Sequence, residues 1–206
     1  MENVELDLSI NEADPINDFR RIANELMNKW LLKANSRMYR ITELEFYLKS
    51  SLHNDTYTHA HSMQKEMGKW YYHGSGIDIT FGNQKYHGGI LLRALCDISD
   101  CKNLYYYGPL NVVAELFRNL ESVYRNNFEF GLVPDEHKSL VYEEPICAPR
   151  VGLNSDKNPE MYNKPYRFLI MPMQKHAEKG RIIETIKSYK SIQEINKLFG
   201  YRLKNE

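Results

Sequence analysis

The chain has 206 residues, with 27 acidic and 27 basic side chains and a formal net charge of zero at pH 7. This length suits one domain with a sizeable core, and 42% hydrophobic with 12% aromatic residues indicates a globular, soluble protein. No apolar run approaches a membrane span, and the acidic N-terminus does not resemble a signal peptide, so we expect a cytoplasmic protein. The cysteines are too few and too irregularly spaced for a disulfide framework or a zinc site, and we interpret all three as buried thiols: Cys96, Cys101 and Cys147.

The neutral total hides an uneven distribution of charge. Residues 1–19 hold six acidic residues and no lysine or arginine, so the other residues carry 21 acids against 27 bases. This mild basic excess is compatible with contacts to nucleic-acid phosphates but does not require them. We expect one domain over residues 1–206, with an acidic N-terminal arm at 1–13 and a basic helical extension at 176–206.

The first predicted element is an amphipathic helix. Asp14 and Pro15 have the character of an N-cap and a first helical residue. Apolar residues then recur at three- and four-residue spacing, which predicts packing on a core: Ile16, Phe19, Ala23, Leu26 and Trp30.

The stretch from Arg40 to Leu48 predicts a strand whose two faces differ. With period two, Glu43 and Glu45 share one face with Ile41 and Tyr47, and apolar residues occupy the other. Same-face neighbours lie roughly 7 Å apart, so each carboxylate raises the cost of ionising the other and a partly buried one could act as a general base. The alternative is a half-exposed strand with a solvated outer face.

A polar loop follows at residues 50–61 and contains three histidines and a carboxylate. A His-x-His pair with an aspartate could bind zinc or iron, but no second cluster of ligands accompanies it. The alternative is a set of loop histidines bonded to nearby backbone or water. The residues concerned are His53, Asp55, His59 and His61.

Residues 70–83 predict a hairpin with a glycine-rich turn, Gly74-Ser75-Gly76, whose glycines do not match a phosphate-binding loop. Asp78 stands between isoleucines and either faces solvent or is held in a pocket. Residues 90–95 predict a buried strand containing Arg93. Its guanidinium needs a carboxylate partner such as Glu43 or Glu45, because an unpaired buried charge is costly.

The remaining pattern predicts a helix over 110–125, a strand over 164–170 and two short C-terminal helices. Ser191 and Glu194 form a capping-box signature before the last helix, and Gly200 is expected to end it.

Four motifs in order over residues 14–171 resemble the monomeric alkyladenine (3-methyladenine) DNA glycosylases of the mammalian type. Residues 40–48 are similar to that family's R-I-V-E-T-E-A-Y-L strand, and residues 55–60 to its D-x-x-x-H-A motif. Residues 90–95 are similar to V-L-L-R-A-L. Residues 149–153 and 164–168 resemble its closing P-R-V-G-[IV] and K-P-x-R-F motifs.

The resemblance implies a mixed α/β domain with a curved antiparallel sheet surrounded by helices. It implies hydrolysis of the N-glycosidic bond of a flipped-out damaged purine in DNA, without a metal or other cofactor. Glu45 would be the general base and Arg93 would hold it, while His59 and Tyr47 would contact the base. We also predict base contacts from Tyr72, His73 and Asp78, and DNA contacts from Arg150, Lys164 and Arg167, with the sheet interior as the alternative location of these three side chains. We expect a monomer without membrane association.

The sequence also departs from this family. The hairpin region at 68–78 is shorter and ends in small polar residues, which cannot wedge a base stack as a bulky side chain does. Asp78 stands where the family has asparagine. Two other functions therefore remain open: a nucleoside or other N-glycoside hydrolase of the same fold, and a catalytically inert nucleic-acid or small-molecule binding module.

Overall fold

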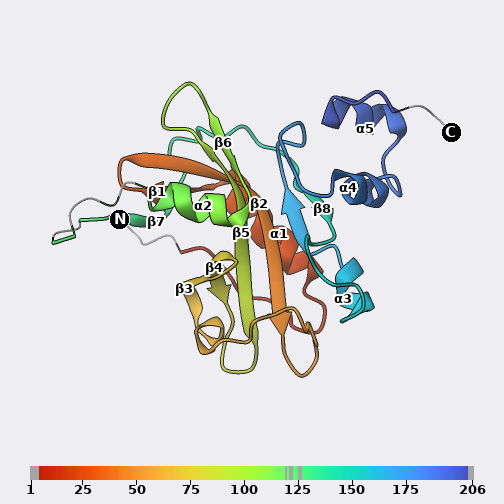
Figure 1. The fold of residues 1–206 in the computed structure, drawn as a ribbon, viewed down its shortest axis with the longest axis horizontal. Coiled ribbons are helices and arrows are strands. Elements are labelled where there is room, and N and C mark those ends of the chain that lie inside the picture. The colour runs from red at the N-terminus through yellow and green to blue at the C-terminus, as the bar shows by residue number, and fades with distance from the viewer. Residues whose placement is uncertain (1–4, 119, 121–122, 125–126, 204–206) are drawn as a thin grey trace.

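The two longest strands, β2 (Arg37–Lys49) and β5 (His87–Asp97), pair antiparallel along most of their length and run through the centre of the molecule (Figure 1). The computed structural model describes residues 5–118, 120, 123–124 and 127–203. Seven shorter strands complete the sheet: β1 (Trp30–Ala34), β3 (Met67–His73), β4 (Gly76–Phe81), β6 (Leu104–Tyr107), β7 (Phe130–Pro134), β8 (Ile146–Ala148) and β9 (Arg167–Leu169).

The outer edge of each long strand is shared by two short ones. Strands β1 and β9 pair with different parts of β2, and β4 and β6 pair with different parts of β5, all antiparallel. The sheet also curls. Strands β3 and β7 lie at opposite ends of the main strand order, yet the rings of Trp70 in β3 and Phe130 in β7 have only 4.6 Å between their centroids. The predicted curved antiparallel sheet is confirmed.

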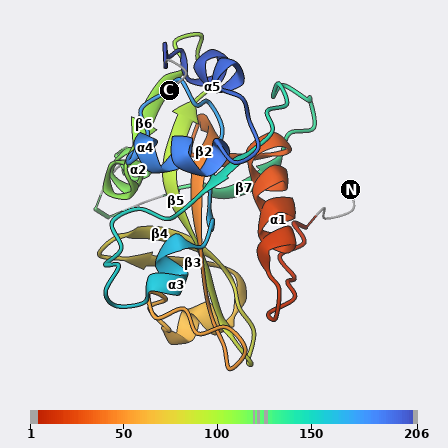
Figure 2. The ribbon, with the colours of Figure 1, turned by 90° about the vertical axis from the view of Figure 1, so that its right-hand side faces the viewer.

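Helices pack around this sheet. Helix α1 (Ile16–Asn28) lies on one side of the central strands and α2 (Pro109–Leu116) on the other (Figure 2). Phe19 of α1 stacks on Phe46 of β2 with 4.4 Å between ring centroids, so the apolar face of β2 is buried as predicted. The other helices are η1 (Ser62–Lys65), α3 (Pro159–Asn163), α4 (Lys179–Ile186) and α5 (Ile192–Phe199).

The C-terminal helices have their own small apolar cluster. Ile182 and Ile186 of α4 and Phe199 of α5 pack with Ile146 and Leu169 of β8 and β9. The predicted capping box of α5 is present, and Gly200 ends the helix at φ +66°, a left-handed conformation that favours glycine. The two predicted C-terminal helices are therefore confirmed.

Several predicted boundaries were wrong. Pro15 occupies the N-cap position of α1 with no side-chain cap, and Trp30 begins β1 instead of continuing the helix. The helix predicted over 110–125 ends at Leu116. Phe117 still packs against the core, but the next members of the predicted stripe do not continue this packing: Leu120 and Tyr124 are 51% and 92% exposed. Residues 119, 121, 122 and 125 of that prediction lie outside the described residues.

Cys101 is exposed, so only Cys96 fits the prediction of a fully buried thiol, and Cys147 is half-buried. Across the part of the chain that the structure describes, no helix is long and apolar enough to cross a membrane.

Candidate active site

Two β-bulges interrupt the pairing of β2 with β5. Glu43 pairs with Ala94 and Leu44 with Leu92, so Arg93 is an extra residue on β5. A bulge turns its extra residue out of the regular alternation and can direct it at a site. Here the redirected residue is the arginine that the sequence had placed in a buried strand.

The second bulge lies on β2 at Thr42, between the pairs formed by Ile41 and Glu43. It breaks the period-two alternation at that point. Ile41 therefore joins Leu44 in the main apolar core, and the prediction that Ile41 shares the face of Glu43 is wrong.

Arg93 contacts both carboxylates of β2. Its Nε lies 3.0 Å from Glu43 Oε1, and its Nη1 lies 3.3 Å from Glu45 Oε2. Both glutamate side chains are 0% exposed, which rules out the solvated outer face considered as an alternative. The expected partners of the buried guanidinium are confirmed.

Glu43 has the character of a structural anion. Arg167 Nε lies 2.9 Å from its Oε1, and His176 Nδ1 lies 2.6 Å from its Oε2. Burial raises the pKa of Glu43, but the His176 hydrogen bond and the charges of Arg167 and Arg93 outweigh burial and lower the pKa to about 2. Glu43 therefore stays ionised and is a poor proton acceptor near neutral pH.

Glu45 is held by three donors of different kinds. The Val151 backbone N–H donates to Oε1 at 2.7 Å, the Tyr47 hydroxyl donates to Oε2 at 2.8 Å, and Arg93 Nη1 approaches Oε2. Burial and the charge of Glu45 raise the pKa of Tyr47 well above its usual range, so its hydroxyl is a neutral donor. These contacts fix the direction in which the Glu45 carboxylate points.

Arg150 pairs with Asp55 inside the molecule. Its Nη1 donates to Asp55 Oδ2 at 2.6 Å and its Nη2 to Asp55 Oδ1 at 3.1 Å, with both side chains 0% exposed. The guanidinium carbon also lies 4.5 Å from the centroid of the Tyr47 ring. The DNA contact predicted for Arg150 is therefore wrong, and the alternative of an interior position is confirmed by the burial of both side chains.

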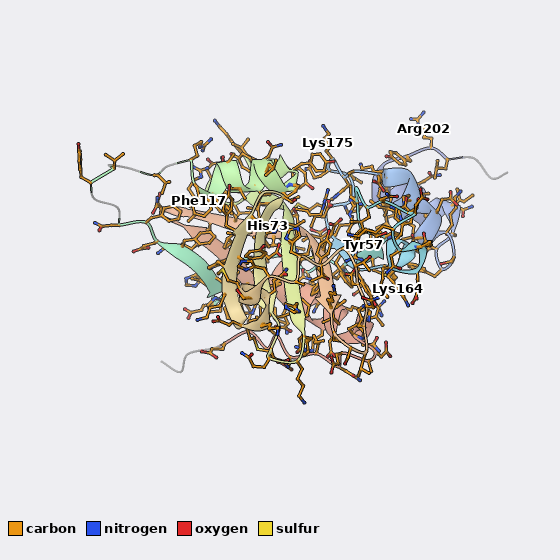
Figure 3. The ribbon with its side chains drawn as sticks, turned by 60° about the horizontal axis from the view of Figure 1, so that its bottom comes forward. Tyr57, His73, Phe117, Lys164, Lys175 and Arg202 are labelled. Carbon is orange, nitrogen blue, oxygen red and sulfur yellow. The ribbon has the colours of Figure 1, made fainter. Side chains whose placement is uncertain are left out.

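Arg167 is likewise buried and contacts Glu43 and the Ala177 carbonyl, so its predicted DNA contact is also wrong. Lys164 differs from both arginines. Its side chain is 39% exposed and forms a surface ion pair with Glu160, so a DNA contact from Lys164 stays a prediction. Figure 3 shows Lys164 with Lys175 and Arg202 on the side of the C-terminal helices, away from Phe117.

A pocket of about 350 Å³ lies directly above the buried charges. Arg93, Val151 and Leu91 contribute to its lining. Glu45 does not line it, but its three donors Tyr47, Arg93 and Val151 do. Four aromatic rings line its walls. They come from β2, from the loop after β2 and from β3: Tyr47, then Tyr57 and His59, then His73. In Figure 3, His73 lies over the β3–β4 hairpin, and Tyr57 lies toward the C-terminal helices.

His73 and Asp78 form one wall of this pocket. His73 Nε2 lies 3.0 Å from Asp78 Oδ1, and Gln64 Nε2 donates to Asp78 Oδ2 at 3.3 Å. Only glycine fits at position 89 next to this wall, because a Cβ at Gly89 would clash with Asp78 Oδ2 at 2.5 Å. Asp78 is thus held in a pocket, which decides between the two interpretations of its sequence position.

His59 completes the wall, with its ring centroid 4.5 Å from that of His73. Burial and the neighbouring His73 ring lower the pKa of His59, and Asp78 only partly offsets them. A largely neutral imidazole can stack on a flat ligand without adding positive charge. The structure therefore brings together five of the predicted base-contacting or catalytic side chains, namely Tyr47, His59, His73, Asp78 and Arg93.

Tyr72 does not belong to this group. Its side chain is 65% exposed, and it does not line the pocket. Neighbouring residues of a strand point to opposite faces, so His73 faces the pocket and Tyr72 faces away. The base contact predicted for Tyr72 is wrong. Tyr71 instead supports the wall, stacking on His61 with 4.8 Å between ring centroids.

The sequence interpretation missed Tyr57, Gln64, Lys157 and Val151, which all line the pocket. Tyr57 stood inside the 55–60 motif and could have been found there. Val151 contributes its backbone N–H, a group that every residue except proline possesses, so its identity carried no signal.

The metal site considered for the loop at 50–61 has no ligand cluster: within the described ranges, no group of three or more His, Cys, Asp or Glu residues could hold a metal ion. Asp55 is committed to Arg150, and His53 is buried beside the Tyr166 ring.

Comparison with known proteins links the chain to one viral protein. It is 30% identical over 189 residues to the uncharacterized protein L759 of Acanthamoeba polyphaga mimivirus, a match that covers 74% of this chain and 85% of the viral protein. No protein-family model matches the chain.

Proposed function

We propose that this chain, which belongs to the same family as the uncharacterized mimivirus protein, is a DNA repair glycosylase. The proposed reaction is hydrolysis of the N-glycosidic bond of a flipped-out alkylated or deaminated purine. The observation that carries the proposal is a single buried carboxylate, Glu45, oriented by Arg93, Tyr47 and the Val151 N–H, three residues that all line an aromatic pocket.

The pocket suits a flat heterocycle better than a flexible chain. Its volume of about 350 Å³ lies at the small end of ligand sites, and its walls present four aromatic rings. Aromatic rings bind a base through its π-face, a contact that every nucleobase offers. A base extruded from DNA would enter between His59 and Tyr47.

The proposed step needs one activated water. The water oxygen forms a bond to C1′ as the C1′–N bond breaks, and the bonding electron pair leaves with the base. The water proton passes to Glu45. A purine alkylated at N3 or N7 is already cationic, so it departs as a neutral base without an added proton. A neutral base such as hypoxanthine or 1,N6-ethenoadenine departs as an anion and takes up a proton from water. We place the water where Tyr47 and Arg93 converge on Glu45 Oε2, since both residues line the pocket.

Surface lysines would contact the DNA backbone in place of the buried arginines. Lys157 lines the pocket, with its Nζ 5.5 Å from the centroid of the Tyr57 ring, and Lys164 is exposed nearby in sequence. A phosphate next to a flipped nucleotide would lie within reach of Lys157. A cytoplasmic location and a monomeric state belong to this proposal as expected from the sequence.

One observation favours the second candidate, hydrolysis of a free nucleoside or another N-glycoside. The turn between β3 and β4 consists of Gly74 and Ser75, and Ser75 itself lines the pocket. A turn that faces the pocket with a small side chain offers no wedge for a DNA duplex. A nucleoside would require no such wedge.

Excision from a short duplex with one hypoxanthine or 1,N6-ethenoadenine tests the proposal. We expect wild type to produce strand breaks after alkali under single-turnover conditions, and Glu45→Gln to bind the duplex without producing them. Glu184→Gln, an exposed glutamate of α4, is the matched control and should behave as wild type.

Two outcomes contradict parts of this proposal. Turnover by Glu45→Gln at the wild-type rate would show that Glu45 is not the base. If the duplexes stay intact but purine nucleosides release free base, the second candidate is correct.

A further inference from the structure

The C-terminal extension reaches into the buried charge network through His176. This side chain is 0% exposed, and its Nδ1 lies 2.6 Å from Glu43 Oε2. Glu43 in turn contacts Arg93, the residue that holds Glu45. A continuous chain of contacts therefore runs from residue 176 to the proposed catalytic carboxylate.

The two ring nitrogens of His176 contact different elements of the protein. Its Nε2 lies 3.0 Å from the Met171 carbonyl oxygen, which can only accept a hydrogen bond, so Nε2 carries a hydrogen. Its Nδ1 faces the ionised Glu43 carboxylate, which also only accepts. Both ring nitrogens therefore face acceptors, so the ring is held in one orientation between Met171 and Glu43.

Residues that follow His176 hydrogen-bond to the loop at 150–153, which lines the pocket. The Gly152 N–H donates to Glu178 Oε1 at 3.2 Å, and Arg181 Nη1 donates to the Arg150 carbonyl at 3.0 Å. Arg181 Nη1 also donates to Glu178 Oε2 at 2.8 Å, which ties the two gripping side chains together. Val151, the donor to Glu45, lies between the two held positions.

We propose that residues 176–181, here named the C-terminal clasp, are part of the reactive site and not a separate tail. His176 is a positioning residue that fixes Arg93 through Glu43, and Arg181 with Glu178 positions the loop whose Val151 N–H holds Glu45. This inference rests on the proposed glycosylase function. It deepens that function by assigning the alignment of Glu45 to a segment outside the resembling motifs.

His176 can act at a distance because the Glu43 carboxylate has partners in different directions. Arg93 and Arg167 both contact Oε1, while His176 contacts Oε2. Without His176 the carboxylate can rotate toward the arginines, and Arg93 Nη1 then shifts relative to Glu45. A misplacement of about 1 Å at a reacting centre can cost about a hundredfold in rate.

Two substitutions of His176 separate positioning from general structural support. His176→Leu removes the donor, whereas His176→Asn keeps an amide N–H near the position of Nδ1. We expect single-turnover excision to fall about a hundredfold in His176→Leu and to recover to within about tenfold of wild type in His176→Asn, with Kd for the damaged duplex unchanged. His137→Leu, at an exposed turn histidine, is the matched control.

A second variant avoids the buried position. The Arg181 side chain is 25% exposed, so Arg181→Gln should fold, and we expect it to slow excision about tenfold without weakening DNA binding. Folded His176→Leu and Arg181→Gln proteins that both excise at the wild-type rate would overturn the inference. So would a His176→Asn variant as slow as His176→Leu.

The clasp can also be tested apart from the glycosylase assignment. If wild type excises no base, the proposed function fails, and the NMR resonance of the Arg93 Nε–H then decides the clasp. We expect that resonance to move in His176→Leu and to return toward its wild-type position in His176→Asn. An unmoved resonance in His176→Leu would show that His176 does not position Arg93.

Discussion

Arg150 and Asp55 form a bidentate ion pair whose side chains are both fully buried, with nitrogen–oxygen distances of 2.6 and 3.1 Å. Three tyrosine rings surround the guanidinium: Tyr47, Tyr57 and Tyr166. The pair joins the loop after β2 to the loop after β8, so it holds two sides of the pocket together.

Breaking this pair should destabilise the protein strongly. Arg150→Met leaves the Asp55 carboxylate buried without its partner, and we expect the free energy of unfolding to fall by about 3–5 kcal/mol. Urea unfolding measures this change. Lys164→Met, which breaks the exposed ion pair with Glu160, is the control and should cost less than about 1 kcal/mol. Equal small losses in both variants would contradict the prediction.

Arg93→Lys should slow excision while leaving the fold intact. A lysine presents one compact charge, whereas Arg93 uses two separate nitrogens to contact Glu43 and Glu45. We expect a loss of about a hundredfold in the single-turnover rate, since Glu45 loses one of its orienting donors. The measurement is base release at saturating enzyme, with circular dichroism as the test of folding. A wild-type rate in Arg93→Lys would remove Arg93 from the mechanism.

Glu43 should make the stability of the protein sensitive to acid. Its pKa is about 2 in the folded protein against an ordinary value of 4.5. Because the folded value is lower, ionised Glu43 stabilises the fold above pH 4.5, and this contribution disappears as pH falls through about 2. Its full size is on the order of 3 kcal/mol.

Urea unfolding between pH 5 and pH 2.5 measures this dependence. Glu43→Gln cannot titrate, so we expect its stability to fall less over this interval than that of wild type, although it is less stable at pH 7. Parallel pH profiles of the two proteins would show that the Glu43 ion pairs do not have this effect.

Lys157→Gln should weaken DNA binding in a salt-dependent way. One phosphate contact contributes a slope of about one in log Kd against log salt, so the slope should fall by about that amount. Lys29→Gln is the control, since Lys29 follows α1 on the side of the sheet opposite the pocket face of β2 and pairs with Glu25. Fluorescence anisotropy at several salt concentrations gives both slopes. An unchanged slope for Lys157→Gln would place the phosphate path elsewhere.

Asp78→Asn should change base choice more than overall activity. The carboxylate puts negative charge in the pocket wall, which favours a cationic base, and asparagine removes the charge at nearly constant shape. We expect the ratio of 7-methylguanine to hypoxanthine excision to fall about tenfold, equivalent to about 1.4 kcal/mol. Competition between two labelled duplexes measures the ratio directly. The same ratio in both proteins would exclude a role for the Asp78 charge in base choice.

The sequence by itself determined the parts of this protein that depend on local pattern. Alternation predicted the apolar face of β2 at Leu44 and Phe46, spacing predicted α1, and the capping box predicted α5. The cost of an unpaired buried charge was enough to predict that Arg93 would find Glu43 or Glu45.

Only the tertiary structure decided which charged groups point inward and which segments meet. Period two cannot reveal bulges, so it could not tell that Ile41 leaves the face of Glu43 or that Arg93 is turned out of its strand. Arg150 and Arg167 read equally well as surface or interior cations, because burial depends on partners distant in sequence: Asp55 lies 95 residues from Arg150. His176 reaches Glu43 across 133 residues, and no local pattern carries such a contact. Local propensity follows from neighbours along the chain, whereas the candidate active site is assembled by long-range packing.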